Sequence, residues 1–339
     1  MHPAAHECPG RGDRSPMSPA QTTDTPRVVV VTGASSGIGR AAAVQAAGRG
    51  DHLVLVARGA AALAQAAAEC TAAGATSVTV LPTDVGDDEE VQACVEQVLD
   101  EHGRIDVVVH SAGVVSYGRV EEVPAEVAEQ VVRTDLLGSL NVARHVVPVL
   151  RRQHEGTLVL LGSVIGHLGV PTMTPYVLSK WGVRALAHQL RLENRDRPGV
   201  HVRYVAPGGV DTPIYTQAAN YAGFVGRPPP PVSSAERAAA QIWRRVDHGW
   251  LPDQLSALNY PMAWGRAYLP WLYDRLVGPL FPVGATDLTR PVAPTDGNVL
   301  APRTQGESTD GDAGSSLAGI ARNLAATLRP GRSPGSPPG

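Results

Sequence analysis

Between Arg27 and Thr212, short and almost continuously apolar segments alternate with longer amphipathic segments. The amphipathic segments have helical length and lie at residues 60–74, 87–102 and 125–153. Strands without polar alternation are buried on both faces, which is typical of a parallel sheet covered by helices on both sides. The sequence therefore predicts an α/β fold with a Rossmann-like, doubly wound parallel sheet in a single domain, followed by a C-terminal extension.

The regions outside this pattern differ in composition. Residues 1–26 are rich in Pro, Ser, Gly and charge, predict a disordered tail, and contain no apolar stretch typical of a signal peptide. Residues 27–250 would form the α/β domain, and residues 251–282 an aromatic-rich helical extension. Residues 283–339 are again rich in Pro, Gly, Ser, Thr and Asp, so we expect them to be mostly disordered, with one short helical candidate at 317–328.

Charge and cysteine content exclude several classes of protein. The net charge is −3 and the arginines are scattered, so there is no basic stripe and we expect no nucleic-acid partner. Cys8, Cys70 and Cys94 are odd in number and lack the spacing of metal ligands. We therefore expect no metal site and a reducing, cytoplasmic location.

The first apolar segment leads into a glycine-rich turn. Residues 27–39 read RVVVVTGASSGIG, a strand, a turn and a helix that opens near Ile38. Glycines allow the tight turn and let backbone N–H groups approach a pyrophosphate, whose charge a helix N-terminus favours. Glycines alone could mark only a turn, but the strand before and the helix after favour a dinucleotide site. The candidate residues are Thr32, Gly33, Ser35, Ser36, Gly37, Ile38 and Gly39.

The end of the second apolar segment bears on the choice of cofactor. In a dinucleotide-binding unit this position meets the adenosine ribose, and an acidic residue there would bind the 2′-hydroxyl of NAD. Ala57 and Arg58 stand there instead, and an arginine can accommodate a 2′-phosphate. The sequence therefore predicts NADP(H), with the alternative that Arg58 is simply one surface arginine among 28.

One ammonium group stands out in this arginine-rich chain. Lys180 is the single lysine, and Tyr176 precedes it by four residues, which places both on one face of a helix. A nearby cation favours phenolate and lowers the pKa of a tyrosine, ordinarily ~10, toward neutrality. Ser163 follows the apolar run at 157–161, so its hydroxyl would lie at the carboxyl edge of the sheet. Such a pair also occurs by chance on helix surfaces, so the surrounding motifs decide between the two interpretations.

These motifs occur together in one order and spacing. TGASSGIG, Tyr176-x-x-x-Lys180, Ser163 thirteen residues before the tyrosine, and PGGVDTP after the sixth apolar segment resemble the short-chain dehydrogenase/reductase family over residues 27–250. The resemblance implies an oxidoreductase that transfers hydride between NADP(H) and a hydroxyl/carbonyl pair. It also implies that Tyr176 is the general acid/base, that Lys180 lowers its pKa and binds the nicotinamide ribose, and that Ser163 polarises the substrate carbonyl.

The resemblance further implies a set of cofactor contacts. Asp84 and Val85 would line the adenine, Ala112 and Gly113 the ribose, and Thr212 with the backbone of Val210 would bind the carboxamide. The complete set outside the glycine turn is Arg58, Asp84, Val85, Ala112, Gly113, Tyr176, Lys180, Pro207, Gly208, Val210 and Thr212.

Two positions depart from the family pattern. The chain has His110-Ser111-Ala112-Gly113 where the family usually has Asn-Asn-Ala-Gly, so a structural amide is lost. Asp135, in TDLLG, replaces the asparagine that usually helps hold a water beside the lysine. If that contact is made by the backbone carbonyl, Asp135 is tolerable; if by the side chain, its carboxylate would pair with Lys180 and weaken the effect on Tyr176. A cofactor-binding sensor or scaffold without turnover therefore remains an alternative.

The substrate side is predicted from the segment after the sixth strand. Residues 214–231 form a variable loop in which Tyr215, Tyr221 and Phe224 could line an apolar pocket for a small-molecule carbonyl or alcohol. We interpret this loop as a substrate lid, with a plain connector as the alternative. His167, four residues after Ser163, could also face the substrate or could lie in a solvent-facing loop.

The C-terminal extension is unusually aromatic. Residues 243–281 hold eight of the fifteen aromatic residues, with a helical stripe at Tyr260, Trp264, Tyr268 and Trp271. Such a stripe is typical of a core or of a contact face in a homo-oligomer. The alternative is an amphipathic segment that lies on a membrane surface, in a peripheral reductase of lipid-like substrates. Charges at positions 266 and 274 interrupt the stretch before it reaches the length that spans a bilayer.

Overall fold

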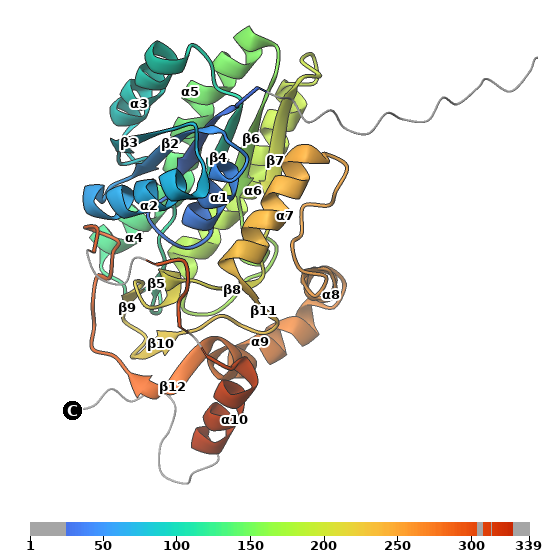
Figure 1. The fold of residues 1–339 in the computed structure, drawn as a ribbon. Coiled ribbons are helices and arrows are strands. Elements are labelled where there is room, and N and C mark those ends of the chain that lie inside the picture. Colours follow the sequence, from blue (N-terminus) through green and yellow to red (C-terminus); the bar gives the residue numbers. More distant parts are fainter. Residues whose placement is uncertain (1–24, 304–307, 313, 328–339) are drawn as a thin grey trace, which may run out of the picture.

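A six-stranded parallel sheet forms the centre of the protein, which is known here from a computed structural model (Figure 1). The structure describes residues 25–303, 308–312 and 314–327, so the predicted disorder of residues 1–24 lies outside it. The strand order is β3-β2-β1-β4-β6-β7, and every pairing is parallel. The strands are β1 (Val28–Thr32), β2 (His52–Ala57), β3 (Ser77–Pro82), β4 (Val107–His110), β6 (Gly156–Leu161) and β7 (Val200–Val205). The predicted α/β fold with a doubly wound parallel sheet is confirmed.

Helices cover both faces of this sheet, and each face has its own apolar core. Successive valines of β1 alternate between the cores: Val28 and Val30 belong to one, Val29 and Val31 to the other. One core is closed by α1 (Gly37–Ala47), α2 (Ala60–Ala73) and α7 (Ala235–Asp247). The other is closed by α3 (Asp88–His102), α5 (Gly138–Gln153) and α6 (Thr174–Glu193).

The long helix predicted at residues 125–153 is interrupted. It consists of α4 (Ala125–Val132), a π-helical turn at Arg133–Leu137 and α5. A π turn inserts an extra residue into the helical register and so changes which side chains face inward. Asp135 lies in this turn and is completely buried.

Short strands shape the region beside the carboxyl edge of the sheet. The segment at 214–231, predicted as a variable loop, contains β9 (Ala219–Asn220) and β10 (Phe224–Gly226). β9 pairs with β5 (Ser116–Tyr117), and β11 (Val232–Ser234) pairs with β8 (Gly209–Asp211). β10 pairs with β12 (Thr286–Pro291), a strand from the C-terminal region.

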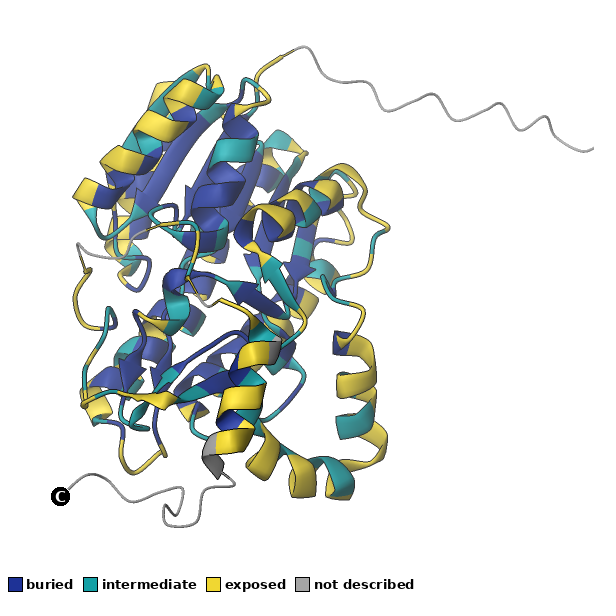
Figure 2. Ribbon diagram, turned by 60° about the horizontal axis from the view of Figure 1, so that its bottom comes forward, coloured by how far each residue is buried: buried dark blue, intermediate teal, exposed yellow. Residues whose placement is uncertain are grey.

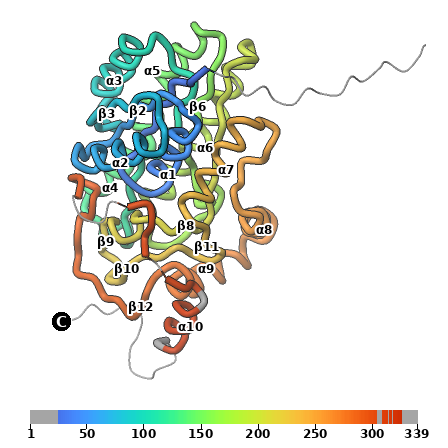
Figure 3. Tube along the Cα trace, viewed as in Figure 1, coloured from blue at the N-terminus to red at the C-terminus, as the bar shows by residue number. Residues whose placement is uncertain are grey.

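The C-terminal region returns to the domain instead of leaving it. The aromatic stretch forms α8 (Asn259–Tyr268) and α9 (Pro270–Ala285), below the carboxyl edge of the sheet in Figure 1. The sequence predicts mostly disorder after residue 282, but the structure shows β12, an ordered loop to residue 303 and α10 (Ser316–Thr327). Figure 3 shows the chain after β12 running back toward α2 and α4. Of the described helices, none is long and apolar enough to cross a membrane.

Candidate active site

The glycine turn after β1 is shaped for close backbone contact. Gly33 has φ +68°, and a Cβ there would lie 2.7 Å from the backbone nitrogen of Ala112. A Cβ on Gly39 would lie 2.3 Å from the carbonyl oxygen of Gly33. Ser36 is the N-cap residue of α1, but its side chain makes no capping hydrogen bond. The turn therefore offers backbone N–H groups, a helix N-terminus and a hydroxyl to an anion, and it fits the pyrophosphate of a dinucleotide.

A groove runs from this turn along the ends of β2, β3 and β4. It encloses a cavity of about 150 Å³. Most of the predicted cofactor residues line it: Gly33, Ser35, Ser36, Gly37, Ile38, Arg58, Asp84, Val85, Ala112, Gly113 and Thr212. The turn residues Thr32 and Gly39 do not line it. Pro207, Gly208 and Val210 line a neighbouring, larger cavity instead.

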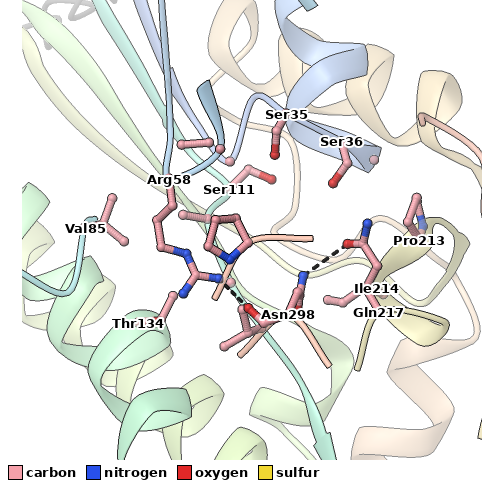
Figure 4. Close-up of a pocket in the computed structure, with 18 of the residues that line it drawn as sticks. Ser35, Ser36, Arg58, Val85, Ser111, Thr134, Pro213, Ile214, Gln217 and Asn298 are labelled. Atoms are coloured by element: carbon pink, nitrogen blue, oxygen red, sulfur yellow. Dashed lines mark hydrogen bonds between the residues drawn. The ribbon is translucent and has the colours of Figure 1, made fainter. Parts of the chain in front are cut away.

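A segment from the C-terminal region already contacts two of the groove's donors, and Figure 4 shows one of these contacts, between Arg58 and Asn298. The Arg58 guanidinium donates to the carbonyl oxygens of Val299, at 2.8 Å, and Asn298. The backbone N–H of Gly37 donates to the carbonyl oxygen of Ser308 at 2.9 Å. The groups predicted to bind the 2′-phosphate and the pyrophosphate are thus both bonded to backbone carbonyls. No sequence pattern indicated these contacts, which join residues about 240 to 270 positions apart.

Ser163, Tyr176 and Lys180 lie together at the edge of the groove. Tyr176 and Lys180 are on α6, and the Lys180 Nζ lies 5.4 Å from the centre of the Tyr176 ring. Ser163 follows β6, and its hydroxyl oxygen accepts a hydrogen bond from the Ile165 N–H at 3.2 Å. Burial raises the pKa of Tyr176 above its ordinary value, the charge of Asp135 raises it further, and a hydrogen bond with Ser163 opposes both. The direction is opposite to the one that the Tyr-x-x-x-Lys spacing predicts.

Asp135 adds to the effect of burial on the pKa of Tyr176. Its Oδ2 lies 3.3 Å from the Lys180 Nζ, and its Oδ1 accepts a hydrogen bond from the Val114 N–H at 2.8 Å. Of the two accounts of this position, the structure shows the side-chain contact. Burial raises the pKa of Asp135, while Lys180 and the Val114 N–H favour its charged form. The ammonium group is therefore paired with a carboxylate and also donates to the Leu161 carbonyl oxygen at 3.3 Å, which weakens its effect on the phenol.

His110 fills the place of the missing asparagine. The Ser139 hydroxyl donates to the Asp135 carbonyl oxygen at 2.6 Å, so it accepts from His110 Nε2 at 3.0 Å. His110 Nδ1 then accepts from the Thr32 hydroxyl at 2.8 Å, and the Thr32 oxygen accepts the N–H groups of Ser111 and Ala112. This pattern requires a neutral imidazole, and burial with the nearby Lys180 lowers the pKa of His110 to about 3. A hydrogen-bonded chain thus joins the glycine turn to the backbone of the π turn.

A second, larger cavity adjoins the groove. Its volume is about 500 Å³, and Ser163, Tyr176 and Lys180 line it. The two cavities meet beside the predicted catalytic residues. The six residues that line both cavities are Ile38, Ser111, Gly113, Leu161, Thr212 and Ile214. The junction is where a cofactor in the groove and a substrate in the large cavity would meet.

Of the four predicted substrate contacts, only Tyr215 lines the large cavity. His167 bonds to Gln254, and burial lowers its pKa to about 4. Tyr221 donates from its hydroxyl to Asp296, and Phe224 lies in β10, paired with β12. Another part of the wall comes from α8, α9 and the residue between them, at positions with no predicted substrate role: Pro261, Met262, Gly265, Leu269, Leu272, Tyr273, Leu276, Val277, Leu280, Phe281, Gly284 and Ala285. Their three- and four-residue spacing was visible in the sequence, but it did not reveal what the apolar face covers.

Comparison with known proteins gives consistent matches. A family model described as short chain dehydrogenase matches residues 27–221. Human dehydrogenase/reductase SDR family member 7 is 33% identical over 193 residues, which are 56% of this chain and 57% of that protein. Sepiapterin reductase from Chlorobaculum tepidum is 31% identical over 56% of this chain and 79% of that protein. This chain thus spans little more than half the length of the human relative.

Solved structures resemble the chain over a longer stretch. An alcohol dehydrogenase from Thermococcus sibiricus, complexed with 5-hydroxy-NADP, has a TM-score of 0.58 and 28% identity and covers 68% of this chain and 95% of that one. A short chain dehydrogenase/reductase from Burkholderia phymatum, in complex with NAD, has a TM-score of 0.65 and 25% identity and covers 73% of this chain and 95% of that one. The family model matches more than half of the chain and includes Ser163, Tyr176 and Lys180. The chain belongs to the short-chain dehydrogenase family.

Proposed function

We propose that this protein is an NADP(H)-preferring oxidoreductase that interconverts a carbonyl and a hydroxyl group on an apolar small molecule. The observation that carries this proposal is the position of Tyr176 and Ser163 beside the junction of two cavities. One cavity has the glycine turn expected for a dinucleotide, and the other is lined mainly by apolar side chains. A hydroxyl/carbonyl pair at the junction would meet both.

The side chains at the junction have separable roles. The Ser163 oxygen accepts the Ile165 N–H, and its hydroxyl, which hydrogen-bonds to Tyr176 here, would turn its proton toward the oxygen of a substrate carbonyl. Tyr176 would donate its proton to that oxygen as negative charge develops there, and in the opposite direction it would accept the proton of an alcohol. Lys180 would stabilise the resulting phenolate, to the extent that Asp135 leaves its charge available.

Bound NADPH would supply the hydride. Ser35, Ser36 and the N–H groups of the turn would hold its pyrophosphate. Arg58 supports the preference for NADP(H), because no acidic residue stands at the end of β2 to bind a ribose 2′-hydroxyl. The two solved relatives carry different cofactors, 5-hydroxy-NADP in one and NAD in the other, so they do not decide this preference.

The ion pair between Asp135 and Lys180 favours a second candidate, a cofactor-binding protein with little turnover. Activity measurements on the unmodified protein and on the Tyr176→Phe variant distinguish the two candidate functions. If the protein is an enzyme, Tyr176→Phe should abolish reduction of a panel of apolar aldehydes and ketones while the affinity for NADPH stays within about twofold. Loss of both would indicate a structural role, and no turnover by the unmodified protein on any compound would favour the second candidate.

The cofactor preference has its own test. We would titrate the protein with NADPH and NADH and follow energy transfer from tryptophan to the nicotinamide. Arg58→Ala should weaken NADPH binding by roughly 10- to 100-fold, which corresponds to a charge-assisted hydrogen bond of ~1.5–3 kcal/mol, and should leave NADH binding nearly unchanged. Arg244→Ala, which removes an exposed arginine of α7, is the matched control. Tighter binding of NADH than NADPH by the unmodified protein would contradict the assignment of Arg58.

A further inference from the structure

Helices α8 and α9, residues 259–285, meet at a bend at Leu269 and pack only loosely on the domain; this bent helix pair is called the hairpin below. Asn259 and Ala285, at its two ends, are its buried residues. Between them, the Tyr273 hydroxyl donates to the Gly169 carbonyl oxygen at 2.7 Å and ties α9 to the loop after β6. Figure 2 shows both helices largely in the colours of exposed and intermediate residues. The hairpin therefore presents most of its surface to its surroundings.

The inner side of this hairpin is a wall of the substrate cavity, and that wall is open. Leu269, Leu276 and Leu280 line the cavity but remain 48%, 45% and 58% exposed. Part of this exposed surface faces the lumen of the cavity, but the cavity itself is only partly enclosed. These leucines therefore form an apolar rim, and the cavity that contains Tyr176 opens to the outside beside hydrocarbon side chains.

The outer side of the hairpin carries three aromatic side chains that do not line the cavity. Trp264, Tyr268 and Trp271 are 67%, 75% and 68% exposed, and the first two rings pack edge to face at 5.9 Å. Clustered exposed rings of this kind indicate a surface that is covered in use. Tryptophan and tyrosine, with an apolar body and a polar edge, are the residues that favour the interface between lipid and water.

Charge on the hairpin agrees with a lipid surface as the covering partner. Its three charged residues are Arg266, Asp274 and Arg275, which give a net charge of +1. Arg275 lies four residues after Trp271, on the same face of α9. Cationic groups next to interfacial aromatic rings match anionic lipid headgroups.

We propose that the α8–α9 hairpin docks on the surface of a lipid bilayer and that long-chain apolar alcohols or carbonyl compounds pass from the bilayer into the cavity through the leucine rim. A protein partner or a second copy seated on the rim would close the mouth of the cavity. A bilayer would cover the rim and also supply the substrate. The docking half of this proposal stands by itself, and the substrate half rests on the function proposed above.

Docking is tested without any measurement of activity. The full chain should co-sediment with vesicles of phosphatidylcholine and phosphatidylglycerol in equal parts. The triple variant Trp264→Ala, Tyr268→Ala and Trp271→Ala should bind at least about tenfold more weakly, because it removes the rings that would enter the interface. These side chains are exposed and lie outside the cavity, so the fold and the cavity should persist.

A single tryptophan outside the hairpin provides the matched control. Trp250, between α7 and α8, is 82% exposed, and Trp250→Ala should leave vesicle binding unchanged. The proposal is overturned if the full chain does not bind vesicles or if Trp250→Ala weakens binding as much as the triple variant. It is also overturned if the full chain is a dimer in sedimentation equilibrium that the triple variant dissociates, because a second copy would then cover the hairpin.

The substrate half is tested by how the substrate is presented. The triple variant should reduce a short, water-soluble aldehyde at the unmodified rate but should lose at least about tenfold in kcat/KM for a long-chain aldehyde carried in the same vesicles. Equal rates with the vesicle-borne aldehyde would overturn the entry route. If the unmodified protein reduces neither aldehyde, the proposed function fails while the vesicle-binding result stands separately.

Discussion

Exchange of Asp135 for asparagine should make Tyr176 a stronger acid. The Asp135 Oδ2 is 3.3 Å from the Lys180 Nζ, which is 5.4 Å from the centre of the Tyr176 ring. The carboxylate is therefore within about 9 Å of that ring, where a unit charge at an effective dielectric constant of ~20 contributes ~2 kcal/mol, or roughly 1.4 pKa units. Asp135→Asn removes this charge, and the amide oxygen can still accept the Val114 N–H. The pKa of Tyr176 should fall by about one unit or more.

The pH dependence of alcohol oxidation reports this shift. In that direction Tyr176 must be deprotonated to act as the base, so the rate rises with pH toward the raised pKa of Tyr176. In Asp135→Asn this rising limb should move by about one unit toward lower pH, and kcat at a fixed pH below the limb should increase by up to roughly tenfold. Asp135 is charged only above its own raised pKa, so we expect the shift of the rising limb at neutral and alkaline pH.

Two results would refute this reasoning. A limb that stays in place or moves to higher pH would mean that the charge of Asp135 does not act on Tyr176. A lower kcat at every pH would mean that the carboxylate is needed to position Lys180. The control is Asp196→Asn, which removes an exposed carboxylate paired with Arg151 and should leave the profile unchanged.

Three further predictions follow from other contacts. His110 is held neutral with a pKa of about 3, below its unfolded value of ~6.5, so its contribution to stability is present above pH ~6.5 and is lost as the pH falls toward 3, at up to ~1.4 kcal/mol per pH unit. His110→Asn should therefore reduce the pH dependence of the free energy of unfolding, measured in urea between pH ~7 and ~4.5, and an unchanged pH dependence would contradict this. Removal of residues 292–339 should free the donors of Arg58, so NADPH should bind roughly five- to tenfold more tightly in the fluorescence titration, with less effect on NADH. Equal or weaker NADPH binding would show that this segment does not compete with the cofactor for Arg58. Ser163→Ala should lower kcat by ~100-fold with little change in the dissociation constant for NADPH, and a loss confined to that constant would exclude its role at the carbonyl.

The sequence by itself determined the architecture and the edge of the sheet at which the predicted catalytic residues lie. Continuous apolar segments separated by amphipathic ones require a parallel sheet with two covered faces, and the valines of β1 do divide between two cores. Residues that follow such segments lie at one edge of the sheet, so the glycine turn, Ser163 and Tyr176 were expected to converge there. These are local patterns of period and spacing, which a single sequence displays.

Tertiary structure alone decided how these groups are tuned. A π turn directs Asp135 onto Lys180, and His110 bridges Thr32 and Ser139 where an asparagine was expected. The carbonyls that contact Arg58 come from about 240 residues further along the chain, and part of the wall of the larger cavity comes from α8 and α9. Contacts over such separations leave no period in the sequence, because they depend on where whole elements pack and on which backbone groups remain available at that place.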